Sequence, residues 1–105
     1  MRFEFHPEAR IEYLEAVRYY EERQAGLGAR FALEIEATIQ RVVEAPQRWH
    51  PIEGEIRRCL AHIFPYGVLY SVKPDRILLL AIMRLSREPG YWRNRIQPGP
   101  AASGS

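Results

Sequence analysis

Apolar residues recur every three or four positions in two stretches of the chain, residues 7–24 and 29–45. This spacing puts them on one face of an amphipathic helix. Pro7 is typical of a first helical turn, and Pro46 ends the second stretch. Between the two stretches, the run Gly26-Leu27-Gly28 interrupts the pattern, so the sequence predicts two antiparallel helices joined by a tight turn.

Each predicted helix has one apolar face. That face consists of Ala9, Tyr13, Ala16, Val17 and Tyr20 in the first helix, and of Phe31, Ala32, Ile35, Ile39, Val42 and Val43 in the second. The acidic residues of the first helix, which include Glu12 and Glu15, fall mostly outside its apolar face. We expect them to be exposed to water. Two such helices need a further apolar surface against which to pack.

Alternation of apolar and polar residues predicts that this surface is a β-sheet. Residues 2–5 form a short N-terminal strand with Phe3 and Phe5 inward. Residues 46–55 contain prolines and a glycine, which favour an irregular connection. Three further strands, joined as an antiparallel meander, are predicted at 56–63, 67–73 and 76–84.

The last of these strands is apolar at every position from Ile77 to Met83, which indicates a central strand covered on both faces. The helices cover one face, and the C-terminal segment or a partner protein would cover the other. The expected fold class is therefore α+β: an N-terminal strand, a helical hairpin, a three-stranded meander and a short C-terminal segment. We expect one domain over residues 1–96 and a flexible tail at 97–105, where Pro, Gly, Ala and Ser prevail.

Composition narrows the class of protein. Cys59 is the only cysteine, which excludes an internal disulfide and fits a reducing cytosol. No local spacing typical of a metal site is present, and we expect neither a metal nor a cofactor. The apolar run at 77–83 is far shorter than the roughly 20 residues of a membrane helix, and the first residues do not read as a secretory leader. We therefore expect a soluble cytoplasmic protein without membrane contact.

Charge divides the chain unevenly. Residues 1–56 contain 7 arginines and 11 acidic residues, whereas residues 57–105 contain 8 lysines and arginines and 2 acidic residues. The formal charges are therefore −4 and +6, which sum to the net charge of +2. Such asymmetry indicates an acidic or phosphate-bearing partner for the basic half, unless its basic side chains only solvate one face of the sheet.

Local motifs accompany this order of elements. They are Tyr19-Tyr20-Glu21 with Gly26-Leu27-Gly28 and Phe31, then Phe64-Pro65-Tyr66, Tyr70, and the ending Arg87-Glu88-Pro89-Gly90-Tyr91-Trp92-Arg93-Asn94-Arg95. The whole set, over residues 2–96, resembles the RelE/ParE superfamily of toxins from bacterial type II toxin-antitoxin systems. Within that superfamily, the chain is most similar to the ParE or plasmid-stabilisation branch.

The resemblance implies a toxin that is silenced by a cognate antitoxin, which wraps an extended or helical segment over the sheet and the hairpin. Operator DNA would then be bound only through the antitoxin. Antitoxin segments tend to be acidic or amphipathic, which suits the basic half of this chain. The expected antitoxin-binding residues are Arg57, Arg58, Tyr70 and Arg84.

One activity of the superfamily is cleavage of messenger RNA in the ribosome, which needs a proton donor or acceptor and a cluster of cations. The candidate catalytic residues are Arg58, His62, Arg84 and Tyr91. Arg84 and Tyr91 lie roughly where RelE-like enzymes place an arginine and a C-terminal tyrosine. The lysine-rich second strand of those enzymes is missing, because Lys73 is the only lysine. Strand alternation also places Arg57 and Arg58 on opposite faces, so both can serve one site only if a bulge intervenes.

The other activity is inhibition of DNA gyrase by binding, which needs a surface rather than an acid and a base. Tryptophan, tyrosine and arginine dominate interface hot spots. The expected target-binding residues are Arg84, Arg87, Tyr91, Trp92 and Arg95, although Tyr91 and Trp92 could equally pin the C-terminal segment to the sheet. We favour gyrase inhibition, which is not an enzymatic activity, over messenger RNA cleavage. An inactive toxin-like binding module is the third interpretation.

Overall fold

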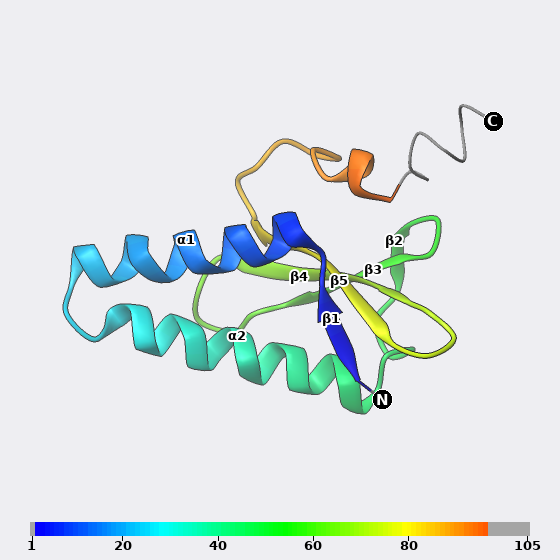
Figure 1. The fold of residues 1–105 in the computed structure, drawn as a ribbon, viewed down its shortest axis with the longest axis horizontal. Helices are drawn as coiled ribbons and strands as arrows, with labels where there is room; N and C mark the ends of the chain where they lie inside the picture. The colour runs from blue at the N-terminus through cyan, green and yellow to red at the C-terminus, as the bar shows by residue number, and fades with distance from the viewer. Residues whose placement is uncertain (1, 97–105) are drawn as a thin grey trace.

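A computed structural model describes residues 2–96 of the chain. It has two long helices and five strands, followed by a C-terminal segment, residues 85–96, that contains one short 3-10 helix (Figure 1). The elements are β1 (Phe3–Phe5), α1 (Pro7–Arg23), α2 (Leu27–Glu44), β2 (Pro51–Glu53), β3 (Ile56–Leu60), β4 (Tyr66–Val72), β5 (Ile77–Arg84) and η1 (Arg93–Arg95). The tail expected at 97–105 lies outside the described residues.

The five strands form one sheet in the order β1-β5-β4-β3-β2. The predicted antiparallel meander is present as β3, β4 and β5. β1 pairs with β5 in the parallel sense, so that the first and last strands of the chain are neighbours. The expectation of an irregular 46–55 connection is wrong in part, because β2 forms within it and pairs with β3 through a bulged, Pro-containing edge.

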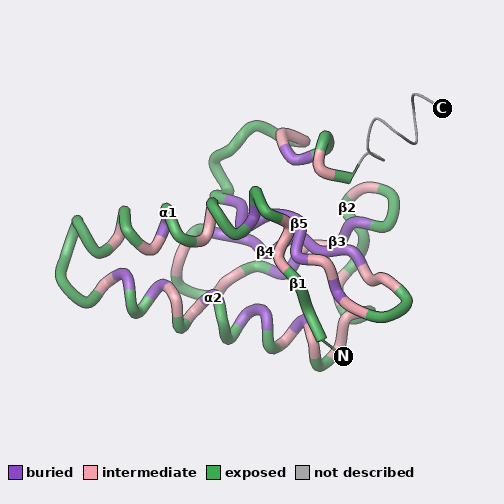
Figure 2. The backbone as a smooth tube through the Cα atoms, viewed as in Figure 1, coloured by how far each residue is buried: buried purple, intermediate pink, exposed green. Residues whose placement is uncertain are grey.

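The helical hairpin covers one face of the sheet, and its turn projects beyond the sheet (Figure 1). The side chains between them form the larger core, centred on Phe31, Ile35 and Tyr70, each 0% exposed. Figure 2 shows the buried positions gathered in the sheet and on the inner sides of both helices. The predicted apolar face of α2 is confirmed at Phe31, Ile35, Ile39 and Val42, which are all buried.

The opposite face of the sheet is covered by the C-terminal segment, residues 85–96. Trp92 is 3% exposed and packs in a second core with Leu69, Leu80 and Met83. The central position of β5 is therefore confirmed, since its side chains enter both cores. The sequence allowed two covers for this face, the C-terminal segment or a partner protein. The structure shows that the C-terminal segment covers it.

Two local expectations need correction. Phe3, predicted inward, is 44% exposed because β1 is an edge strand. The strand predicted at 56–63, which is β3, ends at Leu60 rather than Ile63. The carboxylate of Glu34 accepts hydrogen bonds from the backbone N–H groups of His62 and Ile63 and so holds that stretch against α2. Among residues 2–96, neither helix combines the length and apolar character needed to cross a membrane.

Candidate functional site

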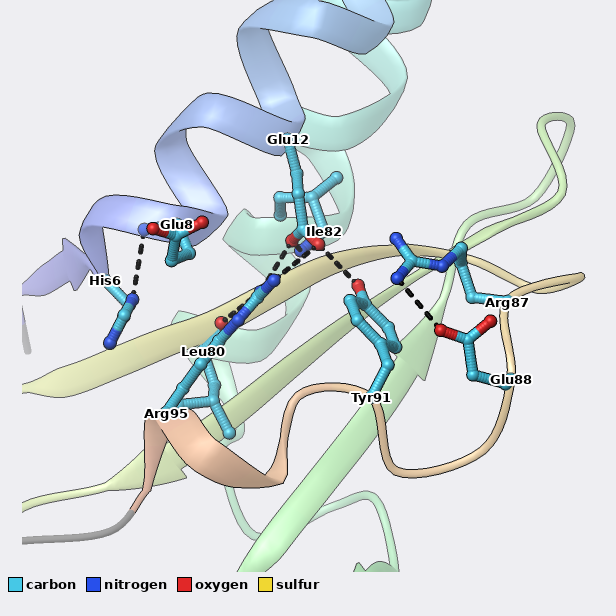
Figure 3. A network of polar contacts seen from close by, with 9 residues as sticks. All are labelled: His6, Glu8, Glu12, Leu80, Ile82, Arg87, Glu88, Tyr91 and Arg95. Carbon is cyan, nitrogen blue, oxygen red and sulfur yellow. Dashed lines mark hydrogen bonds and ion pairs between the residues drawn. The ribbon is translucent and has the colours of Figure 1, made fainter.

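The C-terminal segment is held in place by Glu12 of α1 (Figure 3). Its carboxylate oxygens accept hydrogen bonds from both terminal nitrogens of Arg95, each at 2.9 Å, and from the hydroxyl of Tyr91 at 2.6 Å. The same carboxylate accepts the backbone N–H of Ile82 at 3.0 Å. The side chains of Glu12 and Arg95 are only 17% and 9% exposed, so this bidentate ion pair is largely shielded from water.

This network takes the place of a missing strand. β1 pairs with β5 only as far as Leu79, and beyond it that edge of β5 has no neighbouring strand. Glu12 accepts the N–H of Ile82, and Arg95 donates to the carbonyl oxygen of Leu80 at 3.2 Å. The ion pair therefore satisfies backbone groups whose burial without partners would be unfavourable.

The ring of Tyr91 lies between two arginines. The guanidinium carbons of Arg87 and Arg95 are 3.8 Å and 5.0 Å from its centroid, which are distances of cation–π contact. Burial, followed by the hydrogen bond to Glu12 and the charge of Glu12, raises the pKa of the Tyr91 hydroxyl above its ordinary value. The hydroxyl therefore keeps its proton at neutral pH and is a poor proton donor in catalysis.

A hollow of about 320 Å³ opens between α1, the end of β5 and the C-terminal segment. Its lining includes the aromatic residues Tyr19, Tyr66 and Tyr91, the cations Arg84 and Arg87, and the acids Glu12 and Glu15. Arg84 is exposed, and its guanidinium carbon lies 5.9 Å from the centroid of the Tyr19 ring. It has no acidic partner within residues 2–96. Arg87 is also exposed and pairs only with its neighbour Glu88, at 3.1 Å. The hollow thus presents two solvent-accessible cations beside aromatic rings.

The candidate catalytic residues do not line one hollow. Arg84 and Tyr91 share the hollow just described. Arg58 and His62 line another, of about 730 Å³, together with Trp49 and His50. Arg58 also borders a smaller hollow beneath the C-terminal segment, beside Arg87 and Trp92.

The expected antitoxin-binding residues fall into two groups. Tyr70 is 0% exposed and its hydroxyl donates to the carbonyl oxygen of Pro46 at 2.6 Å, and burial raises its pKa to about 12. Arg57 donates to the side chain of Gln47 at 2.8 Å and to the carbonyl oxygen of Trp49. These two residues hold the connection before β2. Arg58 and Arg84 instead border open hollows.

The expected target-binding residues also differ in exposure. Arg84 and Arg87 are exposed and Tyr91 is half-buried, whereas Trp92 and Arg95 offer little surface. Trp92 packs against the sheet, and Arg95 is bound to Glu12. The C-terminal segment therefore presents Arg87 to solvent, while Trp92 and Arg95 fix it to the sheet and to α1.

Sequence reasoning missed two acidic residues that organise this surface. Glu12, expected on the wet face of α1, is mostly buried by the segment that it binds. Glu53 of β2 binds Arg93 at 2.7 Å, and that hydrogen bond lowers the pKa of the Glu53 carboxyl. The uneven charge distribution was the only signal for these pairs, because it placed spare acids in the first half and spare cations in the second. Part of that asymmetry is neutralised within the chain.

Metal chemistry finds no support in the described side chains. Over residues 2–96, no three His, Cys, Asp or Glu residues gather where they could hold one metal ion. The geometry instead offers an aromatic and cationic surface mounted on a well-fixed segment. Such a surface is suited to binding a partner with acidic groups.

Comparison with known proteins gives a family and a fold. The family model described as "ParE toxin of type II toxin-antitoxin system, parDE" matches residues 3–89. A solved structure, described as "Chromosomal ParDE TA system from P. aeruginosa", is similar to this chain with a TM-score of 0.73 at 13% sequence identity. The similarity covers 82% of this chain and 97% of the other, which shows a shared fold. No curated protein matches the sequence.

Proposed function

Because the chain belongs to the ParE toxin family of type II toxin-antitoxin systems, we propose that it inhibits DNA gyrase by binding until a cognate antitoxin silences it. The family and the fold agree with the resemblance to the RelE/ParE superfamily that the sequence indicated. What is proposed is the target and the manner of action. The surface formed by Arg84, Arg87 and Tyr91 is the proposed point of contact with the target.

One observation carries this proposal. The exposed guanidinium groups of Arg84 and Arg87 flank a hollow that the rings of Tyr19 and Tyr91 line. Arginine and tyrosine are among the residues that most often anchor protein interfaces. The C-terminal segment, which carries Arg87 and Tyr91, is fixed by the Glu12–Arg95 ion pair. Such preorganisation lowers the entropy lost on binding.

The alternative is ribosome-dependent cleavage of messenger RNA. Arg84 and Tyr91 do share a hollow, as a nuclease site would need. However, the Tyr91 hydroxyl donates a hydrogen bond to Glu12 and its pKa is raised, so it keeps its proton. Arg58 and His62 lie in another hollow. Among the four candidate catalytic residues, none beside Arg84 is therefore suited to proton transfer, which favours binding over catalysis. The exposed carboxylate of Glu15 also lines this hollow.

The proposed antitoxin contact uses the cations that have no partner within the chain. Arg58 and Arg84 have no acidic partner among residues 2–96, and both border open hollows. An acidic or amphipathic antitoxin segment could place carboxylates on both arginines. Arg57 and Tyr70 would take part only if the connection at 46–49 moved, since both are bonded to it. Contact with operator DNA would come through the antitoxin.

The first test is induced expression of the chain without an antitoxin gene. Growth, plasmid supercoiling and messenger RNA integrity are read from the same culture. Growth arrest with altered supercoiling or DNA breaks, and with intact messages, is the expected result. Arrest with messages cut at translated codons would establish the nuclease alternative, and no arrest of a folded protein would favour an inactive module.

The second test assigns the surface. The double variant Arg84→Glu/Arg87→Glu reverses both exposed cations, and we expect it to lose growth arrest and inhibition of purified gyrase while remaining folded. Arg30→Glu, at an exposed arginine of α2 that does not line this hollow, is the matched control and should keep full toxicity. Undiminished inhibition by the double variant would remove this hollow from the target contact.

A further inference from the structure

Two of the hollows described above adjoin each other. The hollow of about 730 Å³ lies beside β3 and has Trp49 in its lining. The hollow beneath the C-terminal segment has a volume of about 320 Å³, and its lining includes Arg87 and Trp92. Ile52 and Arg58 line both hollows. Together they form one groove, which we call the β3 groove and which leads from the side of β3 to Arg87.

Two features of the sheet leave this groove open. β2 pairs with β3 only at Ile56 and Arg57, so that within residues 2–96 no strand adjoins β3 on that side from Arg58 onward. Gly67, opposite β3 on β4, has no side chain. A Cβ atom on Gly67 would lie 3.1 Å from Cγ and 3.2 Å from Cδ of Arg58. The aliphatic part of Arg58 therefore occupies the space that this glycine leaves free.

The lining of the β3 groove is cationic. Its arginines are Arg41, Arg58, Arg87 and Arg93. The one acidic residue of the lining, Glu53, is already bound by Arg93 at 2.7 Å. Arg58 has no acidic partner within residues 2–96, and Arg87 pairs only with the adjacent Glu88. Two cations of the groove are thus available to a partner.

Acidic residues of the surrounding elements do not neutralise this lining. The carboxylate of Glu34 accepts hydrogen bonds from the backbone N–H groups of His62 and Ile63. Glu44 at the end of α2 and Glu55 between β2 and β3 line neither of the two hollows. The charge of the groove therefore favours an acidic occupant.

Apolar side chains lie among these cations. Ile52 and Leu60 are 42% and 46% exposed, and Leu85 beneath the C-terminal segment is 43% exposed. Trp49 is half-buried and Trp92 is buried. Nucleic acid strands bind through phosphate contacts and through bases stacked on aromatic rings. The exposed apolar surface here is mostly aliphatic, which suits the side chains of a protein segment better than bases.

We propose that the β3 groove holds an extended protein segment composed of acidic and aliphatic residues. Its carboxylates pair with Arg58 and Arg87, and an aliphatic side chain packs on Ile52 and Leu60. The segment is extended because the hollow beneath the C-terminal segment is narrower than a helix, which is roughly 10 Å thick. It ends at Arg87, because the exposed carboxylate of Glu15 lines the hollow beyond.

This proposal deepens the silencing by an antitoxin and rests on the proposed function in one respect. Arg87 belongs to the proposed target surface and also to the β3 groove. A segment in the groove would therefore cover a residue that the target needs. An antitoxin that carries such a segment would silence the toxin by competing with the target for Arg87.

The first experiment measures binding to the full chain by NMR. The probes are a peptide of about eight residues, long enough to span roughly 26 Å when extended, a lysine counterpart and an oligothymidine of similar length. The peptide has glutamate and leucine in alternating pairs, so that each side of the extended chain carries both kinds of side chain.

The two tryptophans report on the two hollows. Trp49 lines one and Trp92 the other, and the chain has no further tryptophan. The glutamate–leucine peptide should shift both indole N–H signals. Its affinity should exceed that of the lysine–leucine peptide by at least about tenfold, because like charges placed together are strongly unfavourable. Oligothymidine should bind more weakly than the acidic peptide.

Variants separate the contributions to binding. Arg58→Gln should weaken the acidic peptide about tenfold, as expected for a charge-assisted hydrogen bond of a half-buried group. Arg30→Gln, at an exposed arginine that lines neither hollow, is the matched control and should leave affinity unchanged. Gly67→Ala keeps the charge but displaces the Arg58 side chain, and should also weaken the peptide while the protein stays folded.

A second experiment tests the competition at Arg87. The glutamate–leucine peptide should relieve inhibition of purified gyrase, and the lysine–leucine peptide should not. A chain that binds the acidic peptide but never inhibits gyrase would contradict the proposed target and leave the groove in place. Inhibition that persists with both tryptophan signals fully shifted would overturn the shared use of Arg87.

Four binding results would overturn the β3 groove itself. No shift with millimolar peptide would show that nothing docks there. A shift of Trp49 alone would show that the two hollows are not one groove. Equal affinity for the two peptides would exclude an acidic preference, and tighter binding of oligothymidine would assign the surface to nucleic acid.

Discussion

The two faces of the sheet are covered in different ways. On one face, α1 and α2 satisfy their own backbone hydrogen bonds and contribute the larger core around Phe31. On the other, the mostly irregular segment 85–96 depends on side chains of distant elements, namely Glu12 and Glu53, and on the burial of Trp92. The first face provides most of the stability, and the second presents the proposed target surface.

This difference indicates how the protein can vary its binding surface without losing its fold. Local opening of a segment is easiest where few elements hold it and its backbone makes few regular bonds. The C-terminal face fits that description, whereas the helices are held by their own backbone hydrogen bonds and by the larger core. Substitutions on the two faces should therefore differ in the stability that they remove and in the part of the molecule that opens.

The largest expected effect is on the helical face. Phe31→Ala removes a fully buried ring that contacts Tyr20, Phe64 and Tyr66, and should lower the free energy of unfolding by about 4 kcal/mol. Urea denaturation measures this loss. Leu33→Ala, at a side chain that is 66% exposed, is the control and should change stability little. A loss below 1 kcal/mol for Phe31→Ala would contradict the assignment of stability to this face.

A smaller and more local effect is expected at Glu12. Glu12→Ala leaves Arg95 without its partner and frees the Tyr91 hydroxyl, which should cost about 3 kcal/mol. Hydrogen exchange should accelerate in residues 85–96 before it does in α2. Glu15→Ala, on the same helix but outside the network, is the control. Simultaneous acceleration in both regions would mean that the two faces open together.

The close packing of the hairpin offers the next test. A Cβ atom on Gly28 would lie 2.6 Å from the carbonyl oxygen of Val17, so Gly28→Ala must push α1 and α2 apart. We expect a loss of about 2 kcal/mol by urea denaturation. Gly54→Ala adds only the backbone strain of a positive φ of 54°, because nothing lies within 4 Å of its Cβ, and should cost about 1 kcal/mol. Equal losses would show that the helices are not tightly apposed.

The smallest effect concerns alkaline pH. Burial raises the pKa of Tyr91 above that of an unfolded tyrosine, which is about 10. The unfolded chain then loses this proton first, so the stability present below pH 10 falls as the pH rises further. Tyr91→Phe should make that fall shallower, by about 1 kcal/mol at most at pH 11. An unchanged slope would place the Tyr91 hydroxyl in water.

The sequence predicts what depends on local periodicity. Both helices, the meander and the central place of β5 follow from apolar spacing, which each segment carries within itself. The pairing of β1 with β5 and the role of Glu12 depend on contacts between distant segments, which periodicity does not encode. Glu12 has the same sequence signature as Glu15, and only the C-terminal segment distinguishes them. Arg84, Arg87 and Tyr91 stay predicted target-binding residues, whereas the sequence did not predict that Glu12 holds Tyr91 and Arg95 in place.

The bond between Glu12 and Arg95 spans 83 positions of the chain. Contacts of such separation form late in folding, because a long loop must close before they are gained. During synthesis, α1 emerges from the ribosome well before the segment that it binds. The helical hairpin can therefore assemble while β5 and residues 85–96 are still being made. The surface that carries Arg87 and Tyr91 would be completed only after residues 85–96 have been made, so the proposed target contact would form later than the helical hairpin.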